Sequence, residues 1–319
     1  MGDEETESHA SASQPKILLT GSTGYIGGKL LDKLQTQGHH VRCLARSPEK
    51  LDGQVSESTE VVTGDVLDQA SLENALADID LAYYLVHLMG AKQNFEEKDR
   101  KAAQNFAAAA KQQGVRRIIY MGGLGESSDP DLSPHLRSRQ EVGRILRESG
   151  VETIEFRASV VIGYGSLSFD LVRSLTHRLP VMLCPKWLAT PTQPIAVNDM
   201  LNYLLAAIDY PHGSSKVFEV GGRDVVTYGE LIREYANQKG LKRVMISVPF
   251  LTPWLSSLWL SLVTPASAEV GRHLIEGLRN PTIVRDQTAL AEFDIRPMSI
   301  KEAIQSAIAE SEQPASSQP

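Results

Sequence analysis

The chain of 319 residues contains only two cysteines, Cys43 and Cys184, and only 6% of its residues are aromatic. Two cysteines cannot form the disulfide framework that holds a small secreted domain together. Cys43 lies in an apolar run and Cys184 precedes Pro185, so we expect two packed thiols in a reducing compartment, which indicates the cytoplasm. The eight histidines are scattered without the spacing of metal ligands, and we predict no metal site.

The sequence also lacks an excess of positive charge and a hydrophobic run long enough to cross a membrane. Lys and Arg number 32 against 39 Asp and Glu, giving a net charge of −7, so we do not expect nucleic acid as a partner. The longest apolar stretch, 248–265, is interrupted by prolines and is shorter than the roughly 20 residues of a spanning helix. We expect it to form the core of a small lobe, with contact to a substrate, a peripheral membrane surface or a protein as the alternatives.

Short apolar runs alternate with amphipathic helices through the first half of the chain. The predicted helices are 25–37, 68–77, 94–113 and 136–149, and the predicted strands are 16–20, 41–45, 60–63, 79–86, 116–121 and 151–157. Strands of this length that alternate with helices are typical of βαβ units and a parallel sheet. With right-handed crossovers, these units predict an α/β protein with a doubly wound parallel sheet, the Rossmann fold.

The most informative segment is the glycine-rich loop at residues 20–28, TGSTGYIGG, between the first strand and the first helix. In dinucleotide-binding βαβ units, the first glycine permits a tight turn, the second lets the backbone approach a pyrophosphate, and the third allows close helix packing. Gly21, Gly24 and Gly27 have this spacing. The helix N-terminus adds unpaired N–H groups and partial positive charge. We therefore predict that a dinucleotide is bound by Gly21, Ser22, Thr23, Gly24, Tyr25 and Ile26.

The end of the second strand favours NADP(H), with NAD(H) as the alternative. NAD sites usually place an acid there for the ribose 2′-hydroxyl, whereas an Arg accommodates the 2′-phosphate of NADP. In this sequence Arg46 follows the strand, and the alternative interpretation is a solvated loop residue. After the third strand, Asp65 and Val66 are placed to contact the adenine; in the alternative, Asp65 belongs to a plain turn before a helix capped by Asp68.

The chain divides into four predicted parts. Residues 1–15 and 311–319 are rich in Ser, Glu, Gln and Pro and are expected to be disordered tails. Residues 16–160 are expected to form the NAD(P)-binding Rossmann domain. Residues 161–310 are expected to hold the remaining sheet elements and a small substrate lobe, whose helices begin at the capping boxes 227–230 and 299–302.

These motifs resemble those of the short-chain dehydrogenase/reductase superfamily, in its extended and atypical branch. The resemblance extends over roughly residues 16–310 and is carried by GDVLD (64–68), IIYMGGLG (118–125), RASVVIGYG (157–165), PIAVNDM (194–200) and VFEVGGRDVVTYGEL (217–231), together with the glycine-rich loop. AYYLVHLMG (82–90) and SPHLRSRQEVGRIL (133–146) are similar to NmrA-like and YbjT-type NAD(P)-binding proteins. The resemblance implies a Rossmann fold, an NAD(P) cofactor and oxidoreductase chemistry.

The usual catalytic triad of this superfamily is missing. Its Tyr acts as acid or base, a Lys four residues later lowers the pKa of that Tyr and binds the ribose, and a Ser positions the substrate carbonyl. The resemblance places His135 at the Tyr position and Arg139 at the Lys position, while Gly122 and Gly123 stand where the Ser follows the fifth strand. Arg139 is therefore expected to contact the ribose hydroxyls.

Three interpretations of this altered site are open. His135 is a substitute acid or base, since an imidazole titrates near a pKa of about 6.5. Alternatively, water or the substrate supplies the proton, or the protein binds NADP(H) without turnover, as NmrA-like relatives do. Val86 and His87 are expected beside the nicotinamide ribose, and His87 is a second acid/base candidate. Both histidines also have plain interpretations, His135 at a helix start on the surface and His87 at a strand end.

The sequence therefore predicts a cytoplasmic NADP(H)-binding protein that reduces a small apolar carbonyl or quinone-like substrate. The alternative is a non-catalytic redox sensor, regulator or assembly factor. An epimerase or dehydratase that keeps NAD bound is less favoured, because the Tyr of the triad is missing.

Overall fold

The computed structural model describes residues 14–88, 94–126, 128–248 and 277–313. Most of the predicted tails 1–15 and 311–319, and all but the first residue of the apolar stretch 248–265, lie outside the described residues. Within the described residues, no helix is long and apolar enough to cross a membrane.

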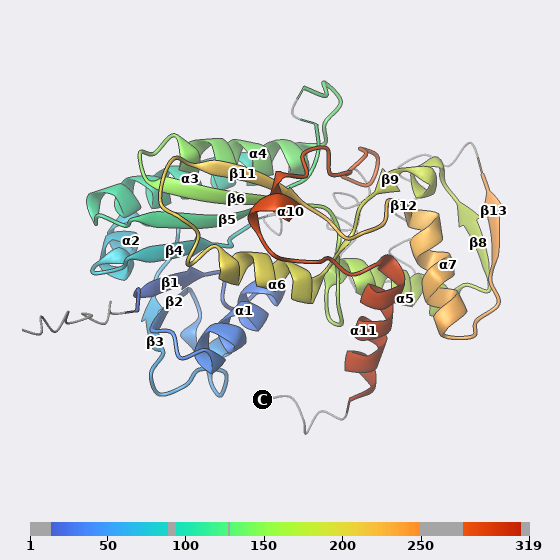
Figure 1. The fold of residues 1–319 in the computed structure, drawn as a ribbon, viewed down its shortest axis with the longest axis horizontal. Helices are drawn as coiled ribbons and strands as arrows, with labels where there is room; N and C mark the ends of the chain where they lie inside the picture. The colour runs from blue at the N-terminus through green and yellow to red at the C-terminus, as the bar shows by residue number, and fades with distance from the viewer. Residues whose placement is uncertain (1–13, 89–93, 127, 249–276, 314–319) are drawn as a thin grey trace, which may run out of the picture.

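A parallel sheet of seven strands forms the centre of the molecule (Figure 1). In spatial order the strands are β11 (Lys216–Val220), β6 (Glu152–Ala158), β5 (Arg117–Gly123), β4 (Leu81–Tyr84), β1 (Ile17–Thr20), β2 (Val41–Ala45) and β3 (Glu60–Thr63). Every neighbouring pair is parallel. The strand order reverses between β1 and β4, which is the switch point where such sheets bind ligands. The predicted doubly wound sheet is confirmed.

Helices cover both faces of this sheet (Figure 1). On one face, the core is built from α1 (Tyr25–Thr36) and α6 (Val197–Ala206). The other face packs against α2 (Gln69–Leu76), α3 (Phe95–Gln112) and α4 (Pro134–Arg147). Side chains alternate across β1, so Ile17 and Leu19 enter the first layer and Leu18 enters the second.

The remaining elements form a smaller lobe beyond one end of the sheet (Figure 1). They are β7 (Val161–Ile162), α5 (Leu167–Arg178), β8 (Val181–Cys184), η2 (Lys186–Ala189), β9 (Pro191–Thr192), β10 (Ile195–Ala196), β12 (Val226–Thr227), α7 (Tyr228–Gln238), β13 (Val244–Ser247) and α11 (Ile300–Glu312). This lobe has a hydrophobic core of its own, in which Phe169, Trp187, Leu231 and Ile304 are buried. Both predicted capping boxes are formed, at the starts of α7 and α11. Two further short helices, η1 (Pro48–Leu51) and α10 (Thr288–Glu292), pack beside the main sheet.

Element boundaries differ from the predictions at two places that shape the cleft. Helix α4 begins at Pro134 rather than at residue 136, because Ser133 accepts the N–H of Leu136 as N-cap and Pro134 is suited to the first helical position. This places His135 in the first turn of α4. Strand β5 continues to Gly123, two residues beyond the predicted end, because its pairing with β6 extends to Ala158.

Candidate functional site

The glycine-rich loop turns sharply where the strand order reverses. Gly21 has a φ of +74°, and a Cβ there would lie 2.7 Å from the carbonyl oxygen of Leu85, just after β4. A Cβ at Gly27 would overlap the carbonyl oxygen of Gly21. Any side chain at either position would therefore displace backbone, so the turn and the packing of α1 both require glycine.

The N-terminus of α1 is open to an anion. Gly24 is its N-cap, no side chain caps the helix, and no acidic residue lies in the first turn. The first N–H groups of a helix have no partners within it, and the helix dipole adds partial positive charge there. The loop and this N-terminus therefore fit the diphosphate of a dinucleotide.

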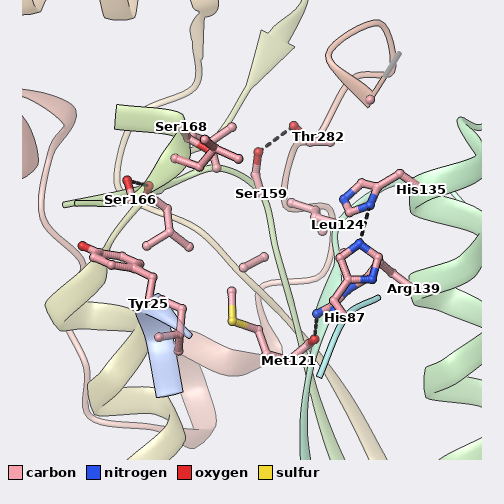
Figure 2. Close-up of a pocket in the computed structure, with 18 of the residues that line it drawn as sticks. Tyr25, His87, Met121, Leu124, His135, Arg139, Ser159, Ser166, Ser168 and Thr282 are labelled. Atoms are coloured by element: carbon pink, nitrogen blue, oxygen red, sulfur yellow. Dashed lines mark hydrogen bonds between the residues drawn. The ribbon is translucent and has the colours of Figure 1, made fainter. Parts of the chain in front are cut away.

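A cleft of about 400 Å³ opens at the carboxyl ends of β1, β4, β5 and β6 (Figure 2). The glycine-rich loop forms one wall. The other walls are mostly apolar and include Met121, Leu124, Leu136, Val160 and Val161. A nicotinamide ring and a small apolar substrate are the kind of ligand that such a lining suits.

Two predicted residues, His87 and His135, meet at one side of this cleft (Figure 2). His87 Nε2 lies 3.0 Å from His135 Nδ1. The other ring nitrogen of His87, Nδ1, lies 3.0 Å from Oδ2 of Asp99 in α3. That carboxylate also accepts the Ser138 hydroxyl at 2.8 Å and the Leu88 N–H at 2.9 Å. Three segments of the chain, the loop after β4, α3 and α4, thus meet around one buried carboxylate.

Burial and hydrogen bonds set the charge states in this group. Burial opposes ionisation of Asp99, but its hydrogen bonds and its interaction with His87 outweigh burial and lower its pKa. Burial lowers the pKa of His87, with hydrogen bonding to Asp99 acting in the opposite direction and Arg139 acting in the same one. At neutral pH an ionised Asp99 therefore faces a neutral His87.

These charge states fix the direction of the hydrogen bonds. An ionised carboxylate only accepts, so the His87 proton is on Nδ1 and its Nε2 accepts. The donor at 3.0 Å from that Nε2 is therefore the Nδ1–H group of His135.

Arg139 lines the cleft at the end of β5. Its guanidinium donates to the carbonyl oxygen of Met121 (Figure 2) and lies over the Tyr120 ring, 5.1 Å from the ring centroid. The Tyr120 hydroxyl donates in turn to the carbonyl oxygen of Arg139 at 2.8 Å. A Cβ at Gly123 would lie 2.9 Å from Leu136 Cδ2, so α4 fills the space beside the position where the superfamily has its Ser.

The structure brings only some of the predicted site residues together. Seven line the cleft, and they are Gly21, Gly24, Tyr25, Ile26, His87, His135 and Arg139. Six others do not line it, and they are Ser22, Thr23, Arg46, Asp65, Val66 and Val86. Of these six, Ser22 and Val66 are buried.

Three of these six residues, Arg46, Asp65 and Val66, lie near the ends of β2 and β3. Arg46 is exposed directly after β2, and within the described part of the chain it forms no hydrogen bond or ion pair. The Asp65 carboxylate accepts the N–H of Leu67 at 2.9 Å, and Asp68 caps α2. This geometry favours the plain turn that was the alternative interpretation of Asp65.

Asp99 is a functional candidate that the sequence interpretation missed. It is 2% exposed and lies three residues before Ala102 and seven before Phe106, on the buried face of α3. An acid on the apolar face of a helix needs partners, because an unpaired buried charge is costly. Asp99 is a charged residue within the otherwise apolar stripe of α3, and this exception was the signal in the sequence that could have identified it.

Comparisons with known proteins agree with this geometry. Residues 21–159 match a family model described as NAD(P)H-binding. UDP-glucose 4-epimerase of Vibrio cholerae is 24% identical over 253 residues, which cover 69% of this chain and 74% of that protein.

Two solved structures share the fold along nearly the whole chain. An NADPH-dependent quinone oxidoreductase from Escherichia coli, complexed with NADPH, is 18% identical with a TM-score of 0.71, and the match covers 91% of this chain and 98% of that one. Triphenylmethane reductase from Citrobacter sp., complexed with NADP(H), is 16% identical with a TM-score of 0.74, covering 92% and 99%.

Proposed function

We propose that this chain is an NADPH-dependent reductase of small apolar carbonyl or quinone-like substrates. Its residues 21–159 match the NAD(P)H-binding family model, and its fold is that of atypical short-chain dehydrogenase/reductases. One observation carries the proposal: the glycine-rich loop and His135 line the same cleft. An imidazole that can donate a proton therefore lies beside the space for the reactive end of a dinucleotide.

The residues of the cleft have distinct roles in this reaction. When bound, the reduced nicotinamide supplies a hydride to the carbonyl carbon. His135 donates a proton to the carbonyl oxygen as it gains negative charge, so the product is an alcohol, and solvent returns a proton to the imidazole. Arg139, held by the Met121 carbonyl, would contact the ribose hydroxyls of the bound dinucleotide. The apolar walls exclude water and orient the substrate.

The exposed Arg46 supports NADP(H) as the cofactor. It follows β2 directly, at the strand end where an Arg accommodates the 2′-phosphate. Two proteins of the same fold are complexed with NADP(H) or NADPH. Replacement of Arg46 by Ala is therefore expected to weaken NADPH binding about 10- to 100-fold, because a charge-assisted contact to phosphate is lost.

Calorimetry with NADPH and NADH measures this effect. NADH lacks the 2′-phosphate, so its affinity is expected to stay the same in Arg46→Ala. Lys50→Ala, which removes an equal charge from the exposed η1 segment, serves as the control and should leave both affinities unchanged. Equal losses for NADPH and NADH in Arg46→Ala would contradict the NADP(H) assignment.

Steady-state oxidation of NADPH tests the proposed reaction. The substrates to compare are apolar aldehydes, ketones, enones and quinones, and turnover is expected with at least one class, with deuterium transferred from labelled NADPH to the product. Tight NADPH binding without any turnover would replace the proposal with the redox-sensor alternative. NAD released from the denatured protein would favour an epimerase or dehydratase.

Two further parts of the proposal concern organisation and location. We assign residues 16–160 to the NAD(P)-binding domain and 161–310 to the substrate lobe, whose residues Leu167 and Tyr228 also line the cleft. Strand β11 from the second segment adds an edge to the main sheet. A cytoplasmic location is supported by Cys43 and Cys184, which are both buried free thiols.

A further inference from the structure

We propose that Asp99 and His87 are positioning residues that hold His135 in one tautomer and stabilise it in the protonated form that donates to the substrate. This inference rests on the proposed function, in which His135 supplies the proton. It adds two residues that do not touch the substrate but act through the His135 ring.

The first step is the anchoring of Asp99. Its Oδ1 accepts the N–H of Leu88, and its Oδ2 accepts from both His87 and Ser138. Leu88 is the neighbour of His87, so the carboxylate and the imidazole are fixed to the same loop. Ser138 lies one turn after His135 in α4, so the same carboxylate also fixes the helix that carries the proton donor. The three side chains are therefore held in place before any ligand binds.

The second step is the direction of the hydrogen bonds. Ionised Asp99 keeps the proton of His87 on Nδ1, and His87 Nε2 then accepts from His135 Nδ1. Because Nδ1 of His135 is engaged in this way, its Nε2 is the nitrogen that gains and loses the transferable proton. The chain of bonds selects a single reactive atom, as the carboxylate does for the histidine of hydrolytic triads.

The third step is charge. A protonated His135 points its Nδ1–H at a neutral acceptor that is itself bonded to a buried anion. Arg139 interacts electrostatically with His87, and Tyr84 and Tyr120 interact with Asp99. Burial raises the pKa of both tyrosines, that of Tyr120 to about 12, so they stay neutral. The charge of Arg139 lowers the pKa of His87. Asp99 thus acts on His87 in the opposite direction to the charge of Arg139.

Replacement of Asp99 by Asn tests the chain without any enzyme assay. The amide keeps the shape. Because the Leu88 N–H can only donate, the amide oxygen faces Leu88 and the NH₂ group faces His87 and Ser138, which can both accept. Facing His87, it would donate to Nδ1 and move the His87 proton to Nε2, which would then donate to His135 Nδ1. In full-length protein labelled with ¹⁵N-histidine, we expect both rings to be Nδ1–H tautomers in the wild type. In Asp99→Asn, we expect both to become Nε2–H tautomers.

Three variants sharpen this measurement. In His87→Gln, the amide can still accept from His135 and donate to Asp99, so His135 should keep its Nδ1–H tautomer; in His87→Leu it should lose that preference. If Asp99→Asn does not fold, these two variants still test whether His87 sets the tautomer of His135. Glu152→Gln is the matched control, because Glu152 is a buried carboxylate bonded to a different histidine, His212, at the start of β6. It should change neither the His87 nor the His135 signals.

The pH dependence of kcat supplies the second readout. In the wild type, kcat should fall on the alkaline side as His135 loses its proton. In Asp99→Asn, that fall should begin at least one pH unit lower, about a tenfold loss of proton affinity, with KM for NADPH unchanged. Unchanged tautomers in Asp99→Asn would overturn the inference whatever the assays show. A tautomer change in a protein that reduces no substrate would uphold the hydrogen-bonded chain and refute the proposed reaction instead.

Discussion

Replacement of His135 by Gln is expected to lower kcat for the best carbonyl or quinone substrate by a factor of about 10² to 10⁴, the usual contribution of a positioned general acid. The reason is geometric. His135 lines the cleft beside the glycine-rich loop, and Gln cannot donate a proton to a developing alkoxide. Because His135 is assigned no contact with the diphosphate or the 2′-phosphate, the Kd for NADPH should stay within about twofold of the wild-type value.

Stopped-flow and steady-state measurements on His135→Gln separate the three interpretations of the altered triad. His40→Gln is the matched control, because His40 is exposed on the turn before β2, away from the cleft, and should keep full activity. If His135→Gln retains the kcat of the wild type, then water or the substrate supplies the proton and the site only orients the reactants. If the fall in kcat comes with lost NADPH binding, His135 belongs to the cofactor site rather than to the chemistry.

The strands and helices of the main sheet could be predicted because each is specified by its own sequence. Ile17, Leu18 and Leu19 form a continuous apolar run because β1 is buried on both faces, and such runs are typical of central parallel strands. The glycine-rich loop is equally local, since turn, N-cap and packing requirements all fall within a few residues. The doubly wound arrangement follows from the general rules for βαβ units.

The contacts within the cleft could not be predicted in the same way, because they join distant parts of the chain. His87 and His135 were each candidates, but they are 48 residues apart, and their contact depends on how α4 packs beside the end of β4. Asp99 became a candidate only when the structure showed its contacts with His87 and Ser138. In the small lobe, β9, β10 and β12 each have two residues and pair with segments far away, so no local pattern marks them.

The start of α4 shows how a small boundary error changes the interpretation of a site. The apolar periodicity begins at Leu136, but Ser133 and Pro134 are already the N-cap and first turn. With His135 inside the helix rather than before it, its ring lies on the same side as Ser138 and Arg139, one turn further along. Ser133 followed by Pro134 is a sequence signal for the start of a helix. It indicates the first residue of α4 better than the first apolar residue does.

The second large effect is expected for Gly27→Ala, which should lower the Tm measurably and weaken NADPH binding at least about tenfold. A Cβ at this position would overlap the carbonyl oxygen of Gly21 and come within 3.1 Å of the Ser22 Cα, and all of these are backbone atoms that no rotamer change can move. The loop must therefore shift away from α1. Overpacking of this kind typically costs about 1–3 kcal/mol, and the shift also misdirects the N–H groups that face the diphosphate.

Gly28→Ala is the matched control for this change. A Cβ there would lie 3.4 Å from the carbonyl oxygen of Ser22, an ordinary contact, and the position is inside α1, where Ala is favoured over Gly by about 0.5–1 kcal/mol. Gly28→Ala should therefore keep NADPH affinity and match or exceed the wild-type Tm, as measured by calorimetry and thermal unfolding. Two neighbouring glycines of one helix, given the same added methyl group, thus have opposite expected outcomes. Equal NADPH affinities of Gly27→Ala and Gly28→Ala would contradict this prediction. The close packing of α1 on the loop would then not shape the diphosphate site, and the cofactor would have to bind elsewhere in the cleft.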